Sequence, residues 1–277
     1  MLCLSTPIWI INHPLSKGRR FRNIARFLSW QIGSRLSQTA RVFEFANGAR
    51  MLARPGMTGA TGNLYVGLHE FVEMAFLLHF LRPGDLFADV GANVGSYSVL
   101  AGAAVGADVI AFEPGEAFPW LVRNLELNGL TRALARRIAV GATNGIVSFT
   151  YGEDTMNRID PRGAVAVAIT TLDAACRERA PTLIKIDVEG FEADVLQGAG
   201  SILENPNTQA VIMELNDPAA REHLERQGFV CCSYDPLRRS MTAIEPASRN
   251  GIFVKDLTAT GHRVGIAPPF TVRGWTI

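Results

Sequence analysis

Residues 85–100 read DLFADVGANVGSYSVL. An apolar run ends at an acid, Asp89, and two glycines, Gly91 and Gly95, follow before apolar residues resume at helical spacing. This pattern predicts a strand, a tight turn and the start of a helix. Glycines in such a turn allow positive φ and close approach of a ligand, and the first amides of the helix add hydrogen-bond donors. The stretch therefore predicts the ligand-binding turn of an α/β sheet.

The rest of the chain up to residue 255 alternates strand and helix patterns. The segments LFADV, VIAF, LIKIDV and AVIMEL are nearly continuous apolar runs, typical of strands covered by helices on both faces. Such alternation predicts a mostly parallel sheet with right-handed crossovers. The last two strands have no helix between them and should pair antiparallel at one edge. We expect strands at 86–90, 108–113, 134–140, 182–188, 209–215, 229–234 and 250–255, extended pieces at 146–151 and 164–169, and helices at 95–105, 117–128, 191–203 and 218–227.

Composition is that of an ordinary globular protein, with 48% apolar residues, 19% charged residues and a formal net charge of +1. No global field indicates a nucleic-acid partner. Residues 1–50 differ, because they hold eight basic residues and one acid, a net of +7 that leaves −6 for the remainder. Such a segment is most often a solvated helix and linker, but it can also bind a membrane surface, an anionic substrate or the acidic body itself. Here we expect a helix at 21–36, a loop at 54–63 and a helix at 67–81.

The cysteines and the opening residues bear on compartment. None of the four cysteines has CxxC spacing, which favours a reducing, cytoplasmic setting. The opening MLCLSTPIWII is too short to span a bilayer, and its positive charges follow the apolar run, which is the wrong order for a signal peptide.

The glycine turn also indicates the kind of ligand. It reads GANVG, not the dinucleotide fingerprint GxGxxG, and Asn93 stands where the second glycine would admit a pyrophosphate. Asp89 would repel phosphates and attract an amine. Glu113, 22 residues after Gly91, is near the separation expected for an acid that accepts from ribose hydroxyls. A nucleoside with an amino-acid tail, such as S-adenosylmethionine, satisfies both acids, while a glycine turn that binds nothing is the plain alternative.

Four blocks carry a resemblance to a known family. In their order along the chain they resemble the FkbM-type family of class I S-adenosylmethionine-dependent methyltransferases, over roughly residues 64–256. KIDVEG is the most specific motif, and NGIFV at 250–254 is a weaker fifth match. The four blocks are PGDLFADVGANVGSYSVLA (83–101), VIAFEPGEAFPWLVRNLELNGL (109–130), TTLD (170–173) and LIKIDVEGFEADVLQGA (183–199).

The resemblance implies an α/β, Rossmann-like class I methyltransferase fold. Its mostly parallel seven-stranded sheet has an antiparallel last strand and helices on both faces. The implied organisation is a basic N-terminal extension at 1–60, a methyltransferase domain at 61–256 and a C-terminal tail at 257–277. Ala142 stands where such proteins commonly have an acid for the adenine, so backbone amides or Asn144 are expected to hold that ring. The resemblance carries cofactor binding onto Asp89, Gly91, Asn93, Gly95 and Glu113.

The catalytic residues are expected at the ends of the fourth and fifth core strands, beside the cofactor. Methyl transfer to a hydroxyl needs an aligned acceptor and removal of a proton. We predict that Asp187 orients or deprotonates the acceptor, with Glu189 as the second candidate; capping of the following helix is the plain alternative for Glu189. Strand alternation puts Lys185 on the side of Asp187, where it would neutralise Asp187 or Glu214 and lower their basicity.

The sequence leaves open whether a metal ion binds and whether a histidine acts as the base. Asp187 with Glu214 and Asn216 resembles the oxygen ligands with which some O-methyltransferases hold magnesium, although acids at strand ends are common without metal. His69, in the helix before the first core strand, is an alternative base, while His79 among apolar neighbours is expected to be packed. The metal prediction is therefore left unknown.

Together these patterns predict a methyltransferase that uses S-adenosylmethionine to methylate a hydroxyl of a sugar, glycan or natural product. The acceptor class follows from the resemblance alone. The competing hypotheses are a methyltransferase-like scaffold without turnover and an NAD-dependent Rossmann oxidoreductase, which Asn93 disfavours. We expect a small-molecule or glycan acceptor and no nucleic acid, with peripheral membrane contact through residues 1–50 as a secondary hypothesis.

Overall fold

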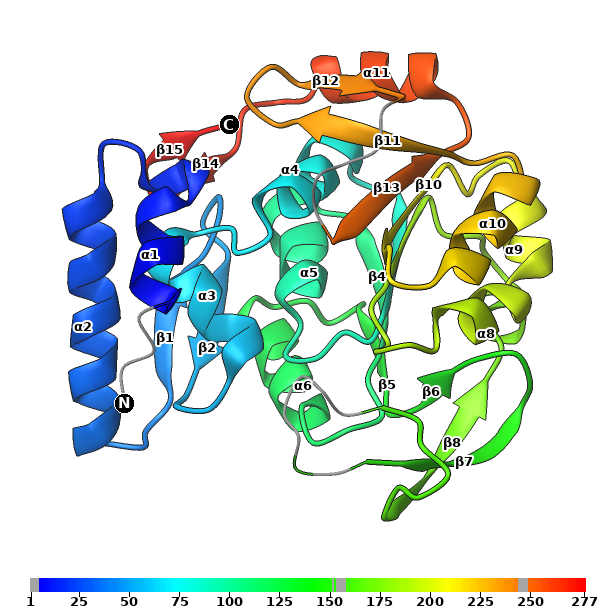
Figure 1. The fold of residues 1–277 in the computed structure, drawn as a ribbon, viewed down its shortest axis with the longest axis horizontal. Coiled ribbons are helices and arrows are strands. Elements are labelled where there is room, and N and C mark those ends of the chain that lie inside the picture. Colours follow the sequence, from blue (N-terminus) through cyan, green and yellow to red (C-terminus); the bar gives the residue numbers. More distant parts are fainter. Residues whose placement is uncertain (1–4, 151, 153–157, 244–248) are drawn as a thin grey trace.

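An eight-stranded sheet forms the centre of the molecule, with helices on both faces (Figure 1). The computed structural model describes residues 5–150, 152, 158–243 and 249–277. The strand order is β12-β11-β13-β10-β9-β3-β4-β5, and β13 runs antiparallel between β10 and β11. This arrangement contains the seven expected strands and the expected antiparallel one, so the α/β fold prediction is confirmed. The strands of this sheet are β3 Leu86–Val90, β4 Asp108–Phe112, β5 Leu134–Arg136, β9 Leu183–Ile186, β10 Ala210–Glu214, β11 Val230–Asp235, β12 Ser240–Thr242 and β13 Asn250–Val254.

Smaller sheets and the helices surround this centre. Three small sheets pair β1 Arg41–Glu44 with β2 Arg50–Ala53, β8 Val165–Thr170 with β6 Ala139–Val140 and β7 Gly145–Phe149, and β14 Thr271–Val272 with β15 Trp275–Thr276. The helices are α1 Ser5–Asn12, α2 Arg20–Leu36, α3 Thr58–Val66, α4 Phe71–Phe80, α5 Ser96–Val99 with a π turn at Leu100–Val105, α6 Phe118–Leu127, α7 Leu172–Ala175, α8 Glu192–Gln197, α9 Gly200–Glu204, α10 Pro218–Arg226 and α11 Leu257–Gly265. None of those within the described ranges is long and apolar enough to cross a bilayer.

Side chains of the central strands alternate between two hydrophobic cores, one on each face. On β3, Phe87 belongs to the core shared with α4, α5 and α6, whereas Ala88 belongs to the core shared with α7 to α10. Both faces of the strand are therefore buried, which explains its continuous apolar sequence. The parallel strands β3, β4, β9 and β10 end at one edge of the sheet, and their carboxyl ends position the site described below.

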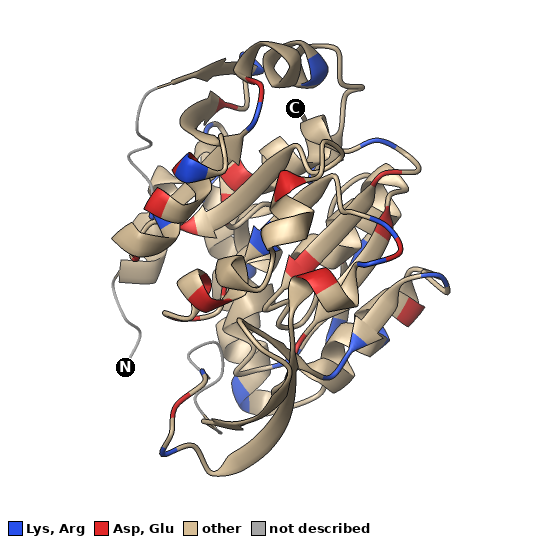
Figure 2. Cartoon of the chain, turned by 90° about the vertical axis from the view of Figure 1, so that its right-hand side faces the viewer, with Lys and Arg blue, Asp and Glu red and all other residues tan. Residues whose placement is uncertain are grey.

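Residues 5–53 pack onto the body and share its larger core. Phe27 and Trp30 of α2 are buried in the same cluster as Phe76 of α4 and Leu100 beside the sheet. Arg19 donates hydrogen bonds to the carbonyls of Arg273 and Gly274, with its guanidinium over the Trp275 ring. The start of α2 and the β14–β15 hairpin are thus joined on the side of the molecule where α1 and α2 lie (Figure 1). On the side drawn in Figure 2, acidic and basic residues are interspersed over the body.

Several local expectations were wrong. The segment at 54–63, expected as a loop, contains the first turns of α3, because Gly59 and Gly62 are there to admit neighbours: a Cβ at Gly62 would lie 2.5 Å from the His69 ring. The strand expected at 134–140 is divided, and β6 leaves the central sheet to pair with β8. The helix at 191–203 breaks at Gly198, where a Cβ would lie 2.1 Å from the carbonyl oxygen of Gly141. Close packing, which composition does not reveal, decided each case.

Candidate functional site

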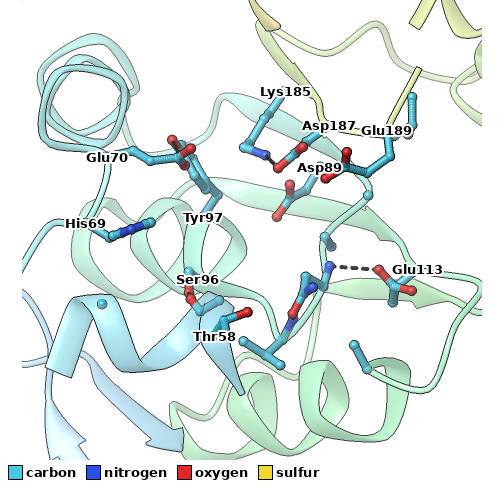
Figure 3. A pocket seen from close by; sticks show the side chains of 18 of the residues that line it. Thr58, His69, Glu70, Asp89, Ser96, Tyr97, Glu113, Lys185, Asp187 and Glu189 are labelled. Carbon is cyan, nitrogen blue, oxygen red and sulfur yellow. Dashed lines mark hydrogen bonds and ion pairs between the residues drawn. The ribbon is translucent and has the colours of Figure 1, made fainter. Parts of the chain in front are cut away.

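A cavity of about 760 Å³ opens at the carboxyl ends of β3, β4, β9 and β10 (Figure 3). Its floor is the turn after β3, and one side is formed by the segments after β9 and β10. The opposite wall comes from α1, α2 and α3, in the N-terminal part of the chain. Cavities of this size suit a ligand of nucleoside dimensions and larger.

The glycine turn takes the shape expected from its sequence. Gly91, Asn93 and Gly95 all have positive φ, of 80°, 50° and 86°. Gly91 also permits a contact between turns: a Cβ there would lie 1.9 Å from the carbonyl oxygen of Asp187. Gly91 and Asn93 line the cavity, whereas Gly95 lies behind it, where a Cβ would lie 2.7 Å from the Leu121 side chain. Gly91 therefore holds the turns after β3 and β9 together, and Gly95 has a packing role.

Asp89 is a carboxylate enclosed at the end of β3. It is 1% exposed, lines the cavity and accepts a hydrogen bond of 2.6 Å from the Ser98 hydroxyl. Burial raises the pKa of Asp89, against the opposing attraction of the Lys185 ammonium. A cationic group entering the cavity would offset this burial cost.

Glu113 lies at the end of β4 and faces the glycine turn. One oxygen accepts from the Asn93 backbone N–H at 2.9 Å and the other from that of Gly115 at 2.7 Å (Figure 3). Burial raises the pKa of Glu113, while these two hydrogen bonds act in the opposite direction. Each carboxylate oxygen can accept a further hydrogen bond, and Glu113 lines the cavity. Both oxygens of Glu113 are therefore held in place and keep acceptor capacity for a ligand in the cavity.

A buried lysine, Lys185 of β9, lies at the side of the cavity formed by the segments after β9 and β10. Lys185 Nζ lies 2.7 Å from an oxygen of Asp187 and 4.6 Å from the centre of the Tyr97 ring (Figure 3). Burial lowers the pKa of Lys185, but attraction to Asp187, Glu70 and Asp89 outweighs it, so its pKa is raised overall. The Tyr97 hydroxyl donates to Glu70 at 2.7 Å. The expected pairing of Lys185 with Asp187 is thus present in the structure.

Glu189 lines the cavity beside Asp187 in a left-handed backbone conformation, with φ of 50°. Helix α8 has no side-chain cap, and Gly190 donates its N–H to Glu192, so Glu189 does not cap the helix. Burial and the neighbouring charge of Asp187 raise the pKa of Glu189. The Glu189 carboxylate is therefore available to interact with a ligand in the cavity.

The oxygen ligands considered for a metal have other partners. Asn216 donates its amide N–H to Glu214 at 2.7 Å, and Arg249 lies 3.5 Å from the same carboxylate. Within the described ranges, no group of three or more His, Cys, Asp or Glu side chains converges on one point. Asn144, a candidate for the adenine, accepts from Thr170 and Thr171 and does not line the cavity; Ile138 to Val140 do.

The sequence did not indicate the residues that α1 to α3 bring to the cavity. Trp9, Gln31 and Tyr65 line it, and the Trp9 ring lies 5.0 Å from the ring of His69. His69 also lines the cavity, and burial lowers its pKa, which favours the neutral imidazole. Hydrophobic spacing places these residues on helices, but only long-range packing places those helices over the sheet. His79, expected to be packed, is buried and bonded to the Tyr234 hydroxyl.

Comparisons with known proteins agree with this fold. Residues 89–231 match the methyltransferase FkbM domain family. The chain belongs to this family. The resemblance expected from the four sequence blocks is thereby confirmed, and S-adenosylmethionine is the cofactor that this membership supports.

Individual relatives are more distant. The hexuronic acid methyltransferase AglP of Haloferax volcanii is 27% identical over 147 residues, which is 50% of this chain and 59% of that protein. The chain thus spans about three fifths of the relative's length. Among solved structures, P. horikoshii TYW2 in complex with MeSAdo has a TM-score of 0.43 and 17% identity, covering 79% of this chain and 73% of that one. The ribosomal protein L11 methylase of Lactobacillus delbrueckii has a TM-score of 0.41 and 18% identity, covering 68% and 79%.

Proposed function

We propose that this FkbM-family protein transfers a methyl group from S-adenosylmethionine to a hydroxyl of a sugar. The observation that carries the proposal is one cavity lined both by the buried acids of the glycine turn, Asp89 and Glu113, and by the acids after β9, Asp187 and Glu189. The match to a hexuronic acid methyltransferase supports a sugar as the acceptor.

The residues of the turn suit the cofactor. Glu113 would accept from the ribose hydroxyls with the lone pairs that the amides of Asn93 and Gly115 leave over. Asp89, whose pKa burial raises, would be stabilised as a carboxylate by the ammonium or sulfonium charge. Gly91 and Asn93 would let the ligand approach the backbone. When bound, the cofactor supplies an electrophilic methyl group.

The chain's own contribution is to exclude water, orient the acceptor and receive its proton. Asp187 is half-exposed and its carboxylate is fixed by Lys185, so we assign it to orienting the acceptor hydroxyl. Glu189 lines the cavity beside Asp187, has a pKa that burial and the charge of Asp187 raise, and has no capping role, so we assign it as the base. The assignment reverses the order of the sequence-based candidates because Lys185 engages Asp187.

The direct test is transfer of a tritiated methyl group from S-adenosylmethionine to an extract of glycans and glycolipids, followed by alkali. A methyl ether on a sugar hydroxyl survives alkali, whereas a methyl ester on a carboxylate releases volatile labelled methanol. We expect alkali-stable label that is lost in Glu189→Gln. Volatile label would contradict hydroxyl methylation, and no transfer despite cofactor binding would favour a scaffold without turnover. Binding of NAD in place of S-adenosylmethionine in calorimetry would contradict the cofactor assignment.

We also propose that α2 contacts an anionic membrane surface. Phe21, Leu28, Ile32 and Leu36 are spaced by seven, four and four residues, so they form one stripe, and Phe21 and Leu36 are 94% and 84% exposed. The first 50 residues add a net charge of +7. An exposed apolar stripe within a basic segment suits the surface of anionic lipid.

This membrane contact is testable by co-sedimentation with phosphatidylserine-containing vesicles. We expect the protein to pellet with them at low salt and the double variant Phe21→Ser/Leu36→Ser to remain in the supernatant. The control is Leu237→Ser, since Leu237 is 67% exposed in the turn between β11 and β12, outside α2. Equal pelleting of all three forms, or a concentration-dependent dimer that the double variant abolishes, would contradict the membrane assignment.

A further inference from the structure

The wall that α1, α2 and α3 add to the cavity has a composition of its own. It presents the Trp9 indole, the Phe27 and Tyr65 rings, and uncharged polar groups such as Gln31 and Thr61. Trp9 is half-buried and its ring is held against His13 at 5.3 Å and His69 at 5.0 Å. Tyr65 packs edge-on against Phe27 at 5.2 Å. The rings are therefore fixed before any ligand arrives.

This wall suits one face and the rim of a pyranose. The axial C–H groups of a sugar ring make an apolar patch that packs against an aromatic face, and its hydroxyls need donors and acceptors around the edge. Gln31 offers both an amide N–H and a carbonyl oxygen. Its Nε2 is 3.5 Å from the Tyr65 hydroxyl, so both side chains can hydrogen-bond to the same part of a sugar ring. His69 adds an imidazole beside Trp9, and burial lowers its pKa.

The remainder of the cavity is strongly acidic. Its lining includes seven Asp and Glu side chains, and among the described lining residues the one Lys or Arg is Lys185. That lysine is 5% exposed and is engaged with Asp187 at 2.7 Å. Arg249, at the edge, is paired with Glu214 and is mostly exposed to solvent. Among the lining residues that the structure describes, no Lys or Arg is left unpaired for an anionic acceptor, and the carboxylates would repel one.

We infer that α1 to α3 hold the acceptor as an uncharged sugar ring stacked on Trp9, and that the acidic lining discriminates against sugars that carry a carboxylate. The inference rests on the proposed methyl transfer and names the acceptor class of that same site. It also separates this chain from its relative AglP, whose name specifies a hexuronic acid. The cationic cofactor and the neutral acceptor would then be selected by two different walls of one cavity.

The first experiment compares matched acceptors. Methyl glucoside and methyl glucuronoside differ only in a hydroxymethyl group against a carboxylate, and galactose and mannose offer similar pairs. The alkali-treated product of the glycan extract is also hydrolysed to monosaccharides and separated by anion exchange. We expect alkali-stable label in the neutral fraction, and at least tenfold higher kcat/KM for the neutral member of any pair that reacts. Label in the acidic fraction would overturn the inference while leaving methyl transfer intact, and absence of label would instead contradict the proposed function.

The second experiment tests the wall directly. Trp9→Ala should raise the KM for the acceptor at least tenfold, with the Kd for S-adenosylmethionine within twofold of wild type. Trp9→Phe keeps an aromatic ring, so its acceptor KM should lie close to that of wild type. Ile8→Ala is the control, since Ile8 is 58% exposed on the same helix and does not line the cavity. An unchanged acceptor KM in Trp9→Ala would overturn the stacking role. Should Trp9→Ala fail to fold, Gln31→Ala tests the same wall by the same split.

A charge swap gives the complementary result. Gln31→Lys places a cation on the uncharged wall and should raise the activity toward the glucuronoside relative to the glucoside by at least fivefold. The same ratio in wild type and variant would contradict electrostatic selection at this wall. Cofactor binding, measured in parallel, shows whether the site has survived the substitution.

Discussion

Glu189 is held in a conformation that few non-glycine residues adopt. A left-handed backbone costs a residue with a Cβ about 1–2 kcal/mol, and such strain persists at positions that function requires. Glu189 combines this conformation with a raised pKa and a place in the cavity lining. Sequence spacing located it at the end of β9, but its backbone angle and the absence of a capping bond came only from the structure.

We expect Glu189→Gly to abolish transfer while leaving the free energy of unfolding unchanged or higher by up to about 1 kcal/mol, because backbone strain and a partly buried carboxyl are both removed. Urea unfolding and turnover are the measurements. Asn47→Gly relieves a similar angle, φ of 52°, away from the cavity and should keep full activity. A stable but fully active Glu189→Gly would contradict the catalytic role.

The raised pKa of Glu189 also predicts the pH dependence of transfer. A base must be deprotonated, so kcat should rise with pH through the Glu189 pKa, which burial and Asp187 hold above the usual glutamate range. The profile of kcat against pH measures this limb, and Glu189→Gln should remove it together with most activity. A limb that is identical in Glu189→Gln would assign the titration to another group.

Asp89 gives a prediction that separates stability from binding. Its folded-state pKa is raised, so its contribution to stability is greatest at low pH, where the carboxyl is neutral, and is lost as pH rises through the folded pKa. Asp89→Asn keeps an oxygen for Ser98 and removes the buried charge. We expect the apo variant to be at least as stable as wild type at neutral pH, with the Kd for S-adenosylmethionine at least tenfold higher by calorimetry. Asp108→Asn, at the other end of β4, should leave that Kd unchanged, and equal affinities in both variants would contradict the role of Asp89.

The turn after β3 and the turn after β9 form one structural unit. Much of it was predictable: Asp89 and Glu113 follow from strand ends and a 22-residue separation, and KIDVEG was recognised as the end of β9. The contact between the turns was not, because no local pattern indicates that Gly91 faces the Asp187 carbonyl. Helix α3 was missed for a related reason, since Gly59 and Gly62 lower helix propensity and are present only because Asn93 and His69 pack against them.

Gly91→Ala should therefore cost far more than an ordinary glycine substitution. The Cβ would meet a backbone oxygen at 1.9 Å and the residue would keep a left-handed φ, so we expect a loss of about 3 kcal/mol or more in unfolding free energy and loss of cofactor binding. Gly84→Ala is the matched control, because Gly84 has φ of 87° with no atom within 4 Å of the added Cβ, and it should cost only the backbone strain of about 1–2 kcal/mol. Similar losses for the two variants, measured in urea, would show that backbone strain alone and not the contact between turns explains the effect.

The N-terminal segment, residues 5–53, and the central sheet share one hydrophobic core. The domain boundaries expected at residues 60 and 256 remain predictions. Composition distinguished residues 1–50 only by charge, and the alternation of Phe21 and Phe27 between surface and core depends on where α2 lies. Phe27 is 3% exposed, packs against Tyr65 and lines the cavity, whereas Phe21 on the same helix is 94% exposed. Residues 5–53 thus contribute both to the shared core and to the lining of the cavity.

This shared core predicts that the segment and the sheet unfold together. Phe27→Ala should lower the free energy of unfolding by about 3–5 kcal/mol, the usual cost of emptying a buried phenylalanine site, while Phe21→Ala should change it by less than about 0.5 kcal/mol. With Trp120 and Trp275 replaced by Phe in every form, tryptophan fluorescence reports Trp9 and Trp30 of α1 and α2, and far-ultraviolet circular dichroism reports the whole fold. The two signals should give coincident urea transitions in both variants. If α1 and α2 were an independent attachment, Phe27→Ala would produce an early fluorescence transition with the remaining transition unmoved. Cofactor binding would then persist after the first step, whereas a shared core requires that it be lost in the single transition.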